Sequence, residues 1–238
     1  MARARNIVLF AGIATYVMLW VGGIFSSVMW GEAPDGAGWA APVFLYLASG
    51  LVLWNGSWRG RGLLLLVGAY GFAAEVIGES TRFPFGSYEY TGTLGPALLG
   101  VPLALFSAWI VVTAFVSGIL LRTNVPRHWW VVVGPVLMVF VDLLLEPVAT
   151  GPMDAWKWTA TGGYYGVPLT NFLGWLGVSV PIFGLLAVFR PGDQRGMMAA
   201  TSVIAFFLVL AVVHLLWGVW LVITGAAVVA LILRRFTG

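Results

Sequence analysis

Four acidic residues form two pairs with the same spacing, and both pairs lie in stretches that are otherwise apolar. Glu75 and Glu79 are four residues apart, and so are Asp142 and Glu146. At this spacing both members of a pair lie on one face of a helix, with Cβ atoms about 5–6 Å apart. Hydrocarbon solvates charge poorly, so acidic groups in a membrane span mark functional sites. These four carboxyl groups are therefore the first candidates.

The composition is that of an integral membrane protein. Of 238 residues, 61% are hydrophobic and 9% are charged, against about 25% charged in soluble domains. A spanning helix needs about 20 apolar residues. The runs that qualify are 6–30, 39–56, 62–79, 98–121, 129–148 and 169–189, and the longer stretch 197–233 is expected to turn near 216–218. We predict a polytopic all-α bundle of about eight transmembrane helices in a single domain, residues 1–238.

Basic residues mark the two sides of this bundle. Over eight spans, Arg82 and Lys157 fall on one side, and the opposite side holds Arg3, Arg5, Arg59, Arg61, Arg122, Arg127, Arg190, Arg195, Arg234 and Arg235. Cytoplasmic loops carry an excess of Lys and Arg. Both termini are therefore predicted to be cytoplasmic, in a multi-pass protein of the plasma membrane. The basic residues form no patch, so we expect no nucleic-acid partner.

Two segments of the chain, 62–121 and 129–189, resemble each other. Each begins with a span that ends in an acidic pair, and each reaches the tetrapeptide Gly-Val-Pro-Leu, at 100–103 and at 166–169. The acids repeat after 67 residues and the tetrapeptide after 66. Chance similarity is the alternative, but the agreement of the offsets favours a parallel repeat. The two acidic pairs are then expected to face one cavity at one depth.

The loops at 80–97 and 150–168 are rich in aromatic residues and glycine. An aromatic belt at the level of the lipid headgroups accounts for part of this pattern. It does not account for the glycines and prolines that alternate with the aromatic residues. Non-helical backbone at membrane depth is tolerated only against protein or a cavity. We therefore expect the loops to lie on the non-cytoplasmic side and to fold back over a cavity.

The residue inventory limits the chemistry to acids and bases. Cysteine is absent, and the two histidines, His128 and His214, stand alone, which disfavours haem, zinc and the usual di-metal bundle sites. We expect neither a metal nor a cofactor. A carboxyl group in an apolar cavity, beside a second carboxylate, can keep its proton at neutral pH. With aromatic faces that stabilise a cation, such a group suits protonation of an apolar alkene. The alternative is that the acids pair with Arg82 or cap helix ends.

Several motifs also resemble a known family, the CruF-type carotenoid 1,2-hydratases, which include bisanhydrobacterioruberin hydratase. The motifs are Glu75-Val-Ile-Gly-Glu79, Phe83-Pro-Phe-Gly-Ser-Tyr-Glu-Tyr-Thr-Gly92, Leu94-Gly-Pro96, Gly100-Val-Pro-Leu103, Asp142-Leu-Leu-Leu-Glu-Pro147, Trp156-Lys-Trp158, Gly163-Tyr-Tyr-Gly-Val-Pro168 and Asn171-Phe-Leu-Gly-Trp175. The resemblance is strong over about 70–180. One departure is that the family usually has Asp-Pro where this chain has Glu146-Pro147.

The resemblance implies addition of water across the terminal C1=C2 double bond of an acyclic carotenoid end group, without a cofactor. One of the four acids would give the proton, with Asp142 favoured because it lies deepest in its span, and the others would activate water or stabilise the cation. Substrate-binding residues would be Arg82, Tyr88, Tyr90, Trp156, Trp158, Tyr164, Tyr165, Asn171 and Trp175. Asn171 would position water, and Arg82 would hold one acid ionised.

The expected partners are a carotenoid, namely lycopene, γ-carotene or a C50 acyclic carotenoid, with water, the lipid bilayer and other enzymes of the carotenoid pathway. Three alternative functions remain open at this stage. A carotenoid cyclase or isomerase would use the same acid, but an internal double bond would capture the cation. A proton-coupled transporter also has intramembrane acids and repeats. A pigment-binding protein would leave the carotenoid unaltered.

Overall fold

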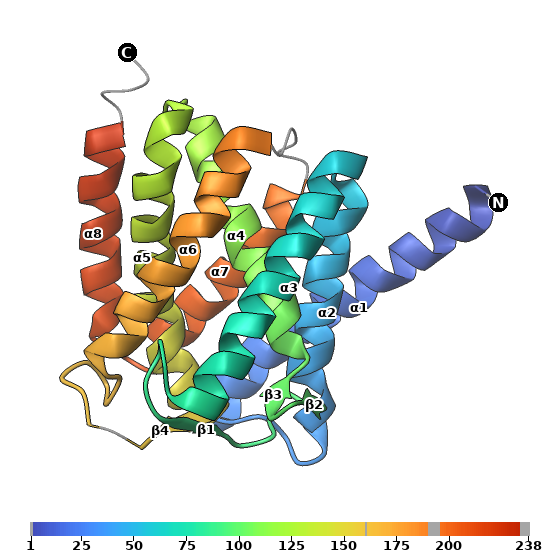
Figure 1. Ribbon diagram of the computed structural model, residues 1–238. Coiled ribbons are helices and arrows are strands. Elements are labelled where there is room, and N and C mark those ends of the chain that lie inside the picture. The colour runs from blue at the N-terminus through green and yellow to red at the C-terminus, as the bar shows by residue number, and fades with distance from the viewer. Residues whose placement is uncertain (1, 160, 190–195, 234–238) are drawn as a thin grey trace.

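The computed structural model describes residues 2–159, 161–189 and 196–233, and in this part of the chain it shows a bundle of eight α-helices (Figure 1). The helices are α1 (Ala2–Trp30), α2 (Ala40–Asn55), α3 (Trp58–Thr81), α4 (Ala104–Arg122), α5 (Trp130–Thr150), α6 (Leu169–Phe189), α7 (Met197–Val213) and α8 (Gly218–Leu233). Two short 3-10 helices, η1 (Ala37–Trp39) and η2 (Arg127–Trp129), precede α2 and α5. The predicted all-α class is confirmed.

The lengths and hydropathy of these helices are those of a multi-pass membrane protein. Within the described residues, six helical segments are long and apolar enough to cross a bilayer: Ala4–Trp30, Ala37–Asn55, Trp58–Thr81, Ala104–Arg122, Arg127–Thr150 and Leu169–Phe189. The α7 helix is apolar but shorter. The stretch 197–233 divides as predicted, because the chain turns between Val213 and Gly218, with Leu215 at a φ of 53°.

One predicted boundary is wrong. The span expected from residue 98 begins at Ala104 instead, because residues 97–102 form a small hairpin of β2 (Ala97–Leu98) and β3 (Val101–Pro102). Gly100 lies in the turn with a φ of 83°, a conformation that glycine adopts without steric cost. Pro102 lacks the amide hydrogen that a helix interior requires. Hydropathy alone could not show this turn.

The α4 helix occupies the middle of the bundle, where it packs against α2, α3, α5 and α7. Its residues Val112, Val116 and Leu120 are almost completely buried. The α1 helix is the opposite case: its N-terminal half leans away from the other helices (Figure 1), and its Phe10 is 74% exposed. Exposed apolar side chains of this kind suit contact with lipid.

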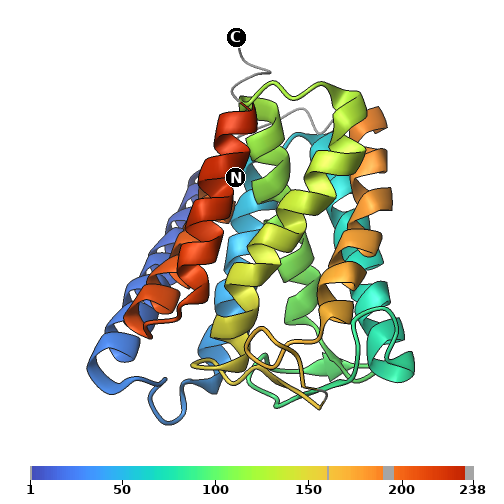
Figure 2. The ribbon, with the colours of Figure 1, turned by 90° about the vertical axis from the view of Figure 1, so that its left-hand side faces the viewer.

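Two strands close one end of the bundle. Strand β1 (Tyr88–Tyr90) follows α3, strand β4 (Trp156–Trp158) follows α5, and the two pair antiparallel. Figure 2 shows the loops that carry them gathered below the ends of the helices. We call β1 and β4 the aromatic ribbon. Each of the two predicted repeat segments, 62–121 and 129–189, contributes one of its strands; the repeat itself remains a prediction.

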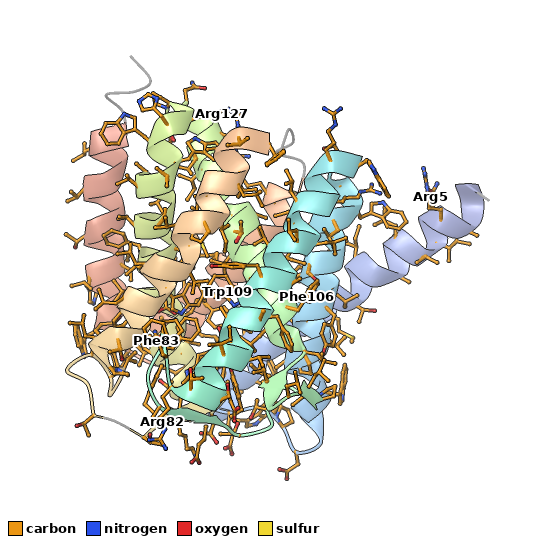
Figure 3. All side chains as sticks on the ribbon, viewed as in Figure 1. Arg5, Arg82, Phe83, Phe106, Trp109 and Arg127 are labelled. Carbon is orange, nitrogen blue, oxygen red and sulfur yellow. The ribbon has the colours of Figure 1, made fainter. Side chains whose placement is uncertain are left out.

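The arginine distribution separates the two ends of the bundle. Arg5 and Arg127 lie at the end away from the aromatic ribbon, whereas Arg82 lies beside it (Figure 3). Arg190, Arg195, Arg234 and Arg235 lie outside the described residues. Which end faces the cytoplasm remains a prediction from the positive-inside rule.

The contact between α5 and α6 depends on a glycine. A Cβ atom added at Gly134 would lie 2.3 Å from the ring of Phe183, and that ring is fully buried. We expect Gly134→Ala to lower the stability by about 1–3 kcal/mol, because the ring has no space to move into. Thermal unfolding in detergent measures this. The control is Gly184→Ala in α6, where an added Cβ meets nothing within 4 Å; equal unfolding temperatures for the two variants would show that the contact is loose.

Candidate active site

Three of the four predicted carboxyl groups come together inside the bundle. Glu75 of α3 is 6% exposed, and Asp142 and Glu146 of α5 are 1% and 2% exposed. Asp142 lies within electrostatic reach of both glutamates. Glu79 does not join them: it is exposed near the end of α3 and packs against the turn at Gly100, where an added Cβ would lie 2.8 Å from its Cδ. We call Glu75, Asp142 and Glu146 the carboxyl cluster.

Glu75 accepts three hydrogen bonds. The hydroxyl groups of Tyr88 and Tyr90 donate to its Oε2 at 2.9 and 3.2 Å, and the indole nitrogen of Trp109 donates to its Oε1 at 3.2 Å. Tyr88 and Tyr90 can reach one carboxyl group because side chains two apart on a strand point to the same face. Glu89 lies between them and points outward, where it is exposed.

Glu146 accepts an equivalent set from the other strand. The indole nitrogens of Trp156 and Trp158 donate to its Oε2 at 3.2 and 2.9 Å. The strand register places Tyr88 opposite Trp158 and Tyr90 opposite Trp156, and the paired rings meet edge to face. The aromatic ribbon therefore presents four polar hydrogens to two buried glutamates.

Asn171 links the two acids of α5. It lies at the start of α6, is 2% exposed, and its Nδ2 donates to Asp142 Oδ2 at 2.7 Å and to Glu146 Oε1 at 3.1 Å. An amide nitrogen has two hydrogens, so one can serve each carboxyl group. Among the described residues this is the hydrogen bond that Asp142 accepts, whereas each glutamate accepts three. Asp142 is therefore the carboxyl group with a free oxygen atom.

The tyrosines that hold Glu75 stay protonated. Burial and the neighbouring Glu75 raise the pKa of the Tyr88 and Tyr90 phenols well above their usual value. Their hydroxyl groups therefore remain hydrogen-bond donors over the whole physiological pH range. The aromatic ribbon is a fixed set of donors rather than a source of protons.

Two cavities meet at the carboxyl cluster. The larger, about 430 Å³, lies between α1, α2, α4, α5 and α7; it is predominantly apolar, and Asp142 forms part of its wall. The smaller, about 30 Å³, is lined by Glu75, Glu146 and Asn171 together with the aromatic ribbon. A water molecule needs roughly 10–15 Å³, so the smaller cavity can hold at least one. Residues Leu105, Trp156 and Trp175 line both cavities.

Arg82 does not reach the carboxyl cluster. It caps the C-terminal end of α3 with a φ of 65° and is exposed (Figure 3). The glutamates are held by neutral O–H and N–H donors instead. Among the described residues, the salt bridge that forms is between Lys157 and Asp154, at 3.4 Å on the outer face of the ribbon.

Tyr164 and Tyr165 lie outside both cavities. The Tyr164 hydroxyl donates to the backbone oxygen of Leu143 at 2.6 Å, and the Tyr165 hydroxyl accepts from the backbone nitrogen of Gly218 at 2.9 Å. Tyr165 also stacks on Trp217, with ring centroids 5.1 Å apart. Burial raises the pKa of the Tyr164 phenol. Both side chains thus attach their loop to α5 and α8.

Sequence reasoning missed Trp109. It lies in the interior of α4 (Figure 3), is 1% exposed, and stacks on Trp175 with ring centroids 4.5 Å apart. A buried indole nitrogen usually finds an acceptor. The available signal was a tryptophan in the middle of an apolar span. Its indole nitrogen needs an acceptor there, and the buried acids are among the few polar groups that can provide one.

Comparison with known proteins gives two matches. A family model described as carotenoid biosynthesis protein matches residues 39–233. Over 124 residues the chain is 35% identical to a protein of Haloarcula japonica named bisanhydrobacterioruberin hydratase. This match covers 50% of the chain and 42% of that relative, so the chain is matched to less than half of the relative's length. No solved structure shows a significant match.

Asn171 should matter for stability as well as for geometry. Asn171→Leu keeps the side-chain size but leaves Asp142 and Glu146 without their shared donor. We expect a loss of about 1–3 kcal/mol, because unpaired buried polar groups keep their desolvation penalty. Thermal unfolding in detergent tests this, with Asn55→Leu as the control, because Asn55 is exposed and donates to the backbone oxygen of Leu51. An Asn171→Leu protein as stable as this control would show that the bridge contributes nothing.

Proposed function

The chain belongs to the carotenoid biosynthesis protein family, and we propose that it is a carotenoid hydratase of the plasma membrane. It adds water across the terminal C1=C2 double bond of an acyclic end group and produces a 1-hydroxy carotenoid. The observation that carries this proposal is the meeting of an apolar pocket, with Asp142 in its wall, and a small polar cavity that contains Glu75 and Glu146. The name of the Haloarcula japonica relative supports it.

The larger pocket suits one end of a long polyene. Its volume of about 430 Å³ lies at the lower end of the range for small-molecule sites, so the rest of the carotenoid stays outside. Met18 and Trp39 line this pocket and are 59% and 54% exposed. The opening is therefore along α1 and η1, where a lipophilic substrate enters from the bilayer. Lycopene, γ-carotene and C50 acyclic carotenoids all carry such an end.

Asp142 gives the proton. It is the member of the carboxyl cluster that lines the substrate pocket, and its Oδ1 is free of the hydrogen bond that Asn171 makes to Oδ2. Transfer of its proton to C2 forms a C–H bond and uses the electron pair of the double bond. The positive charge is then on C1, as a tertiary carbocation, and Asp142 becomes a carboxylate.

Water from the smaller cavity completes the addition. Its oxygen bonds to C1, and its surplus proton passes to a carboxylate of the cluster and returns to Asp142. Glu75 and Glu146 suit the ionised role because each accepts three hydrogen bonds from neutral donors, and an ionised carboxylate is an acceptor only. The reaction is redox-neutral and needs no cofactor. Asn171 lines the water cavity and holds both Asp142 and Glu146, so it positions the water relative to the proton donor.

The same cavity favours hydration over cyclisation. A cyclase that forms the same cation has to keep water away from it until an internal double bond attacks. Here a space for water lies against the carboxyl cluster and shares Trp156 and Trp175 with the pocket. Hydration adds one water to the mass of the carotenoid, whereas cyclisation adds nothing. Other enzymes of the pathway then receive the product within the membrane.

Replacing the proton donor tests the mechanism. We expect Asp142→Asn to lower hydration at least about 100-fold, because general acid catalysis contributes roughly 10²–10⁴ in rate. The assay is chromatography and mass of the carotenoids in a lycopene-producing host that expresses the protein. The control is Asp154→Asn, an exposed acid on the outer face of the ribbon. Normal hydration of the carotenoid by a well-folded Asp142→Asn protein would show that Asp142 is not the proton donor.

Glu75 and Glu79 form a matched pair for a second test. Both lie on α3 one turn apart, and one is buried in the carboxyl cluster while the other is exposed. We expect Glu75→Gln to reduce turnover by about 10- to 100-fold, since the amide cannot take up the proton from water. Glu79→Gln is expected to stay within about twofold of the unmodified protein, since the group lies outside the cluster. Equal losses would mean that the carboxyl cluster is not the reacting site.

A further inference from the structure

Two stacked indoles stand where the substrate pocket meets the water cavity. Trp175 lines both spaces, and Trp109 lines the pocket. Their ring centroids are 4.5 Å apart and their planes differ by 18°. A group that lines both cavities is adjacent to a double bond that receives a proton at one carbon atom and water at the other.

The position of this pair is determined by its surroundings. A Cβ atom at Gly71 would lie 2.3 Å from Cγ of Trp109, so the backbone of α3 packs closely against the Trp109 ring. The Trp109 indole nitrogen is held by Glu75 at 3.2 Å. Trp175 is only partly buried and lines both cavities.

We propose that Trp175 is a catalytic residue whose indole ring stabilises the carbocation at C1, with Trp109 as the positioning residue that holds the ring in place. This inference rests on the proposed function. A tertiary cation in an apolar pocket lacks the solvation that water gives, and the face of an indole attracts a cation more strongly than any other aromatic side chain. Contact with an indole also leaves C1 open to water, whereas contact with a carboxylate risks a covalent ester.

Stacking strengthens the effect. The Glu75 carboxylate, hydrogen-bonded to the Trp109 nitrogen, increases the electron density of that ring, which lies parallel to Trp175. Electrostatic interactions of this kind are stronger where water is excluded. The pair of indoles offers negative charge density to the cation without offering a nucleophile. Trp156 also lines both cavities, but its nitrogen serves Glu146 and its ring meets Tyr90 edge to face.

Site-specific incorporation of fluorinated tryptophans at position 175 tests this inference. Fluorine draws electron density from the ring and weakens its attraction for cations, while the shape of the side chain changes little. We expect kcat to fall stepwise with the number of fluorine atoms, by about tenfold in total, with KM nearly unchanged. The same series at Trp130 is the control, because that indole is buried but lines neither cavity and donates to the backbone oxygen of Val125.

The possible outcomes are distinct. A graded loss at position 175 and a flat series at position 130 support the inference. A flat series at position 175, in a protein that hydrates its carotenoid, overturns the inference and leaves the proposed function intact. Absence of hydration by the unmodified protein would contradict the proposed function itself. Thermal unfolding of each fluorinated protein shows whether a loss of kcat comes from a loss of folding.

Discussion

The hydrogen bonds from the aromatic ribbon to two buried glutamates are the interactions on which this structure depends. A carboxyl group inside a membrane bundle is costly unless donors satisfy its oxygen atoms. Glu75 and Glu146 each receive three donors, and four of the six come from the strands Tyr88–Tyr90 and Trp156–Trp158. The hydrogen bonds that satisfy the buried carboxyl groups therefore also hold the loops that carry these strands against the bundle.

This arrangement also gives the three acids different environments. The ribbon covers Glu75 and Glu146 from the end of the bundle, and the water-sized cavity is left beside them. Asp142, one turn further from the ribbon, is not reached by its donors and faces the apolar pocket instead. In the proposed mechanism, the proton donor and the site for water thus lie next to each other without being equivalent, as addition of water to an alkene requires.

Much of the fold and of the candidate site could be predicted from the sequence. Hydropathy identifies the spanning helices, and residue type identifies the groups that are costly to bury in them. The eight helices, the burial of three of the four acids and the folding of the aromatic loops over a cavity follow from the cost of polar groups in hydrocarbon. The role of Glu79 was not predictable, since spacing places it on the same helix face as Glu75 but does not show that the helix end is exposed. Pairing between the two loops joins residues 66 to 70 positions apart, and no local pattern encodes that contact. Trp109 was missed for a similar reason, because its partner belongs to another helix.

The central claim is that a carbocation formed by protonation is captured by water at this site. Purified protein in lipid nanodiscs, given lycopene in deuterium oxide enriched in oxygen-18, tests it most directly by mass spectrometry and NMR of the product. The account predicts one non-exchangeable deuterium at C2 and one labelled oxygen at C1. A product that contains deuterium but no added oxygen would contradict it. So would a product whose oxygen comes from dissolved O2.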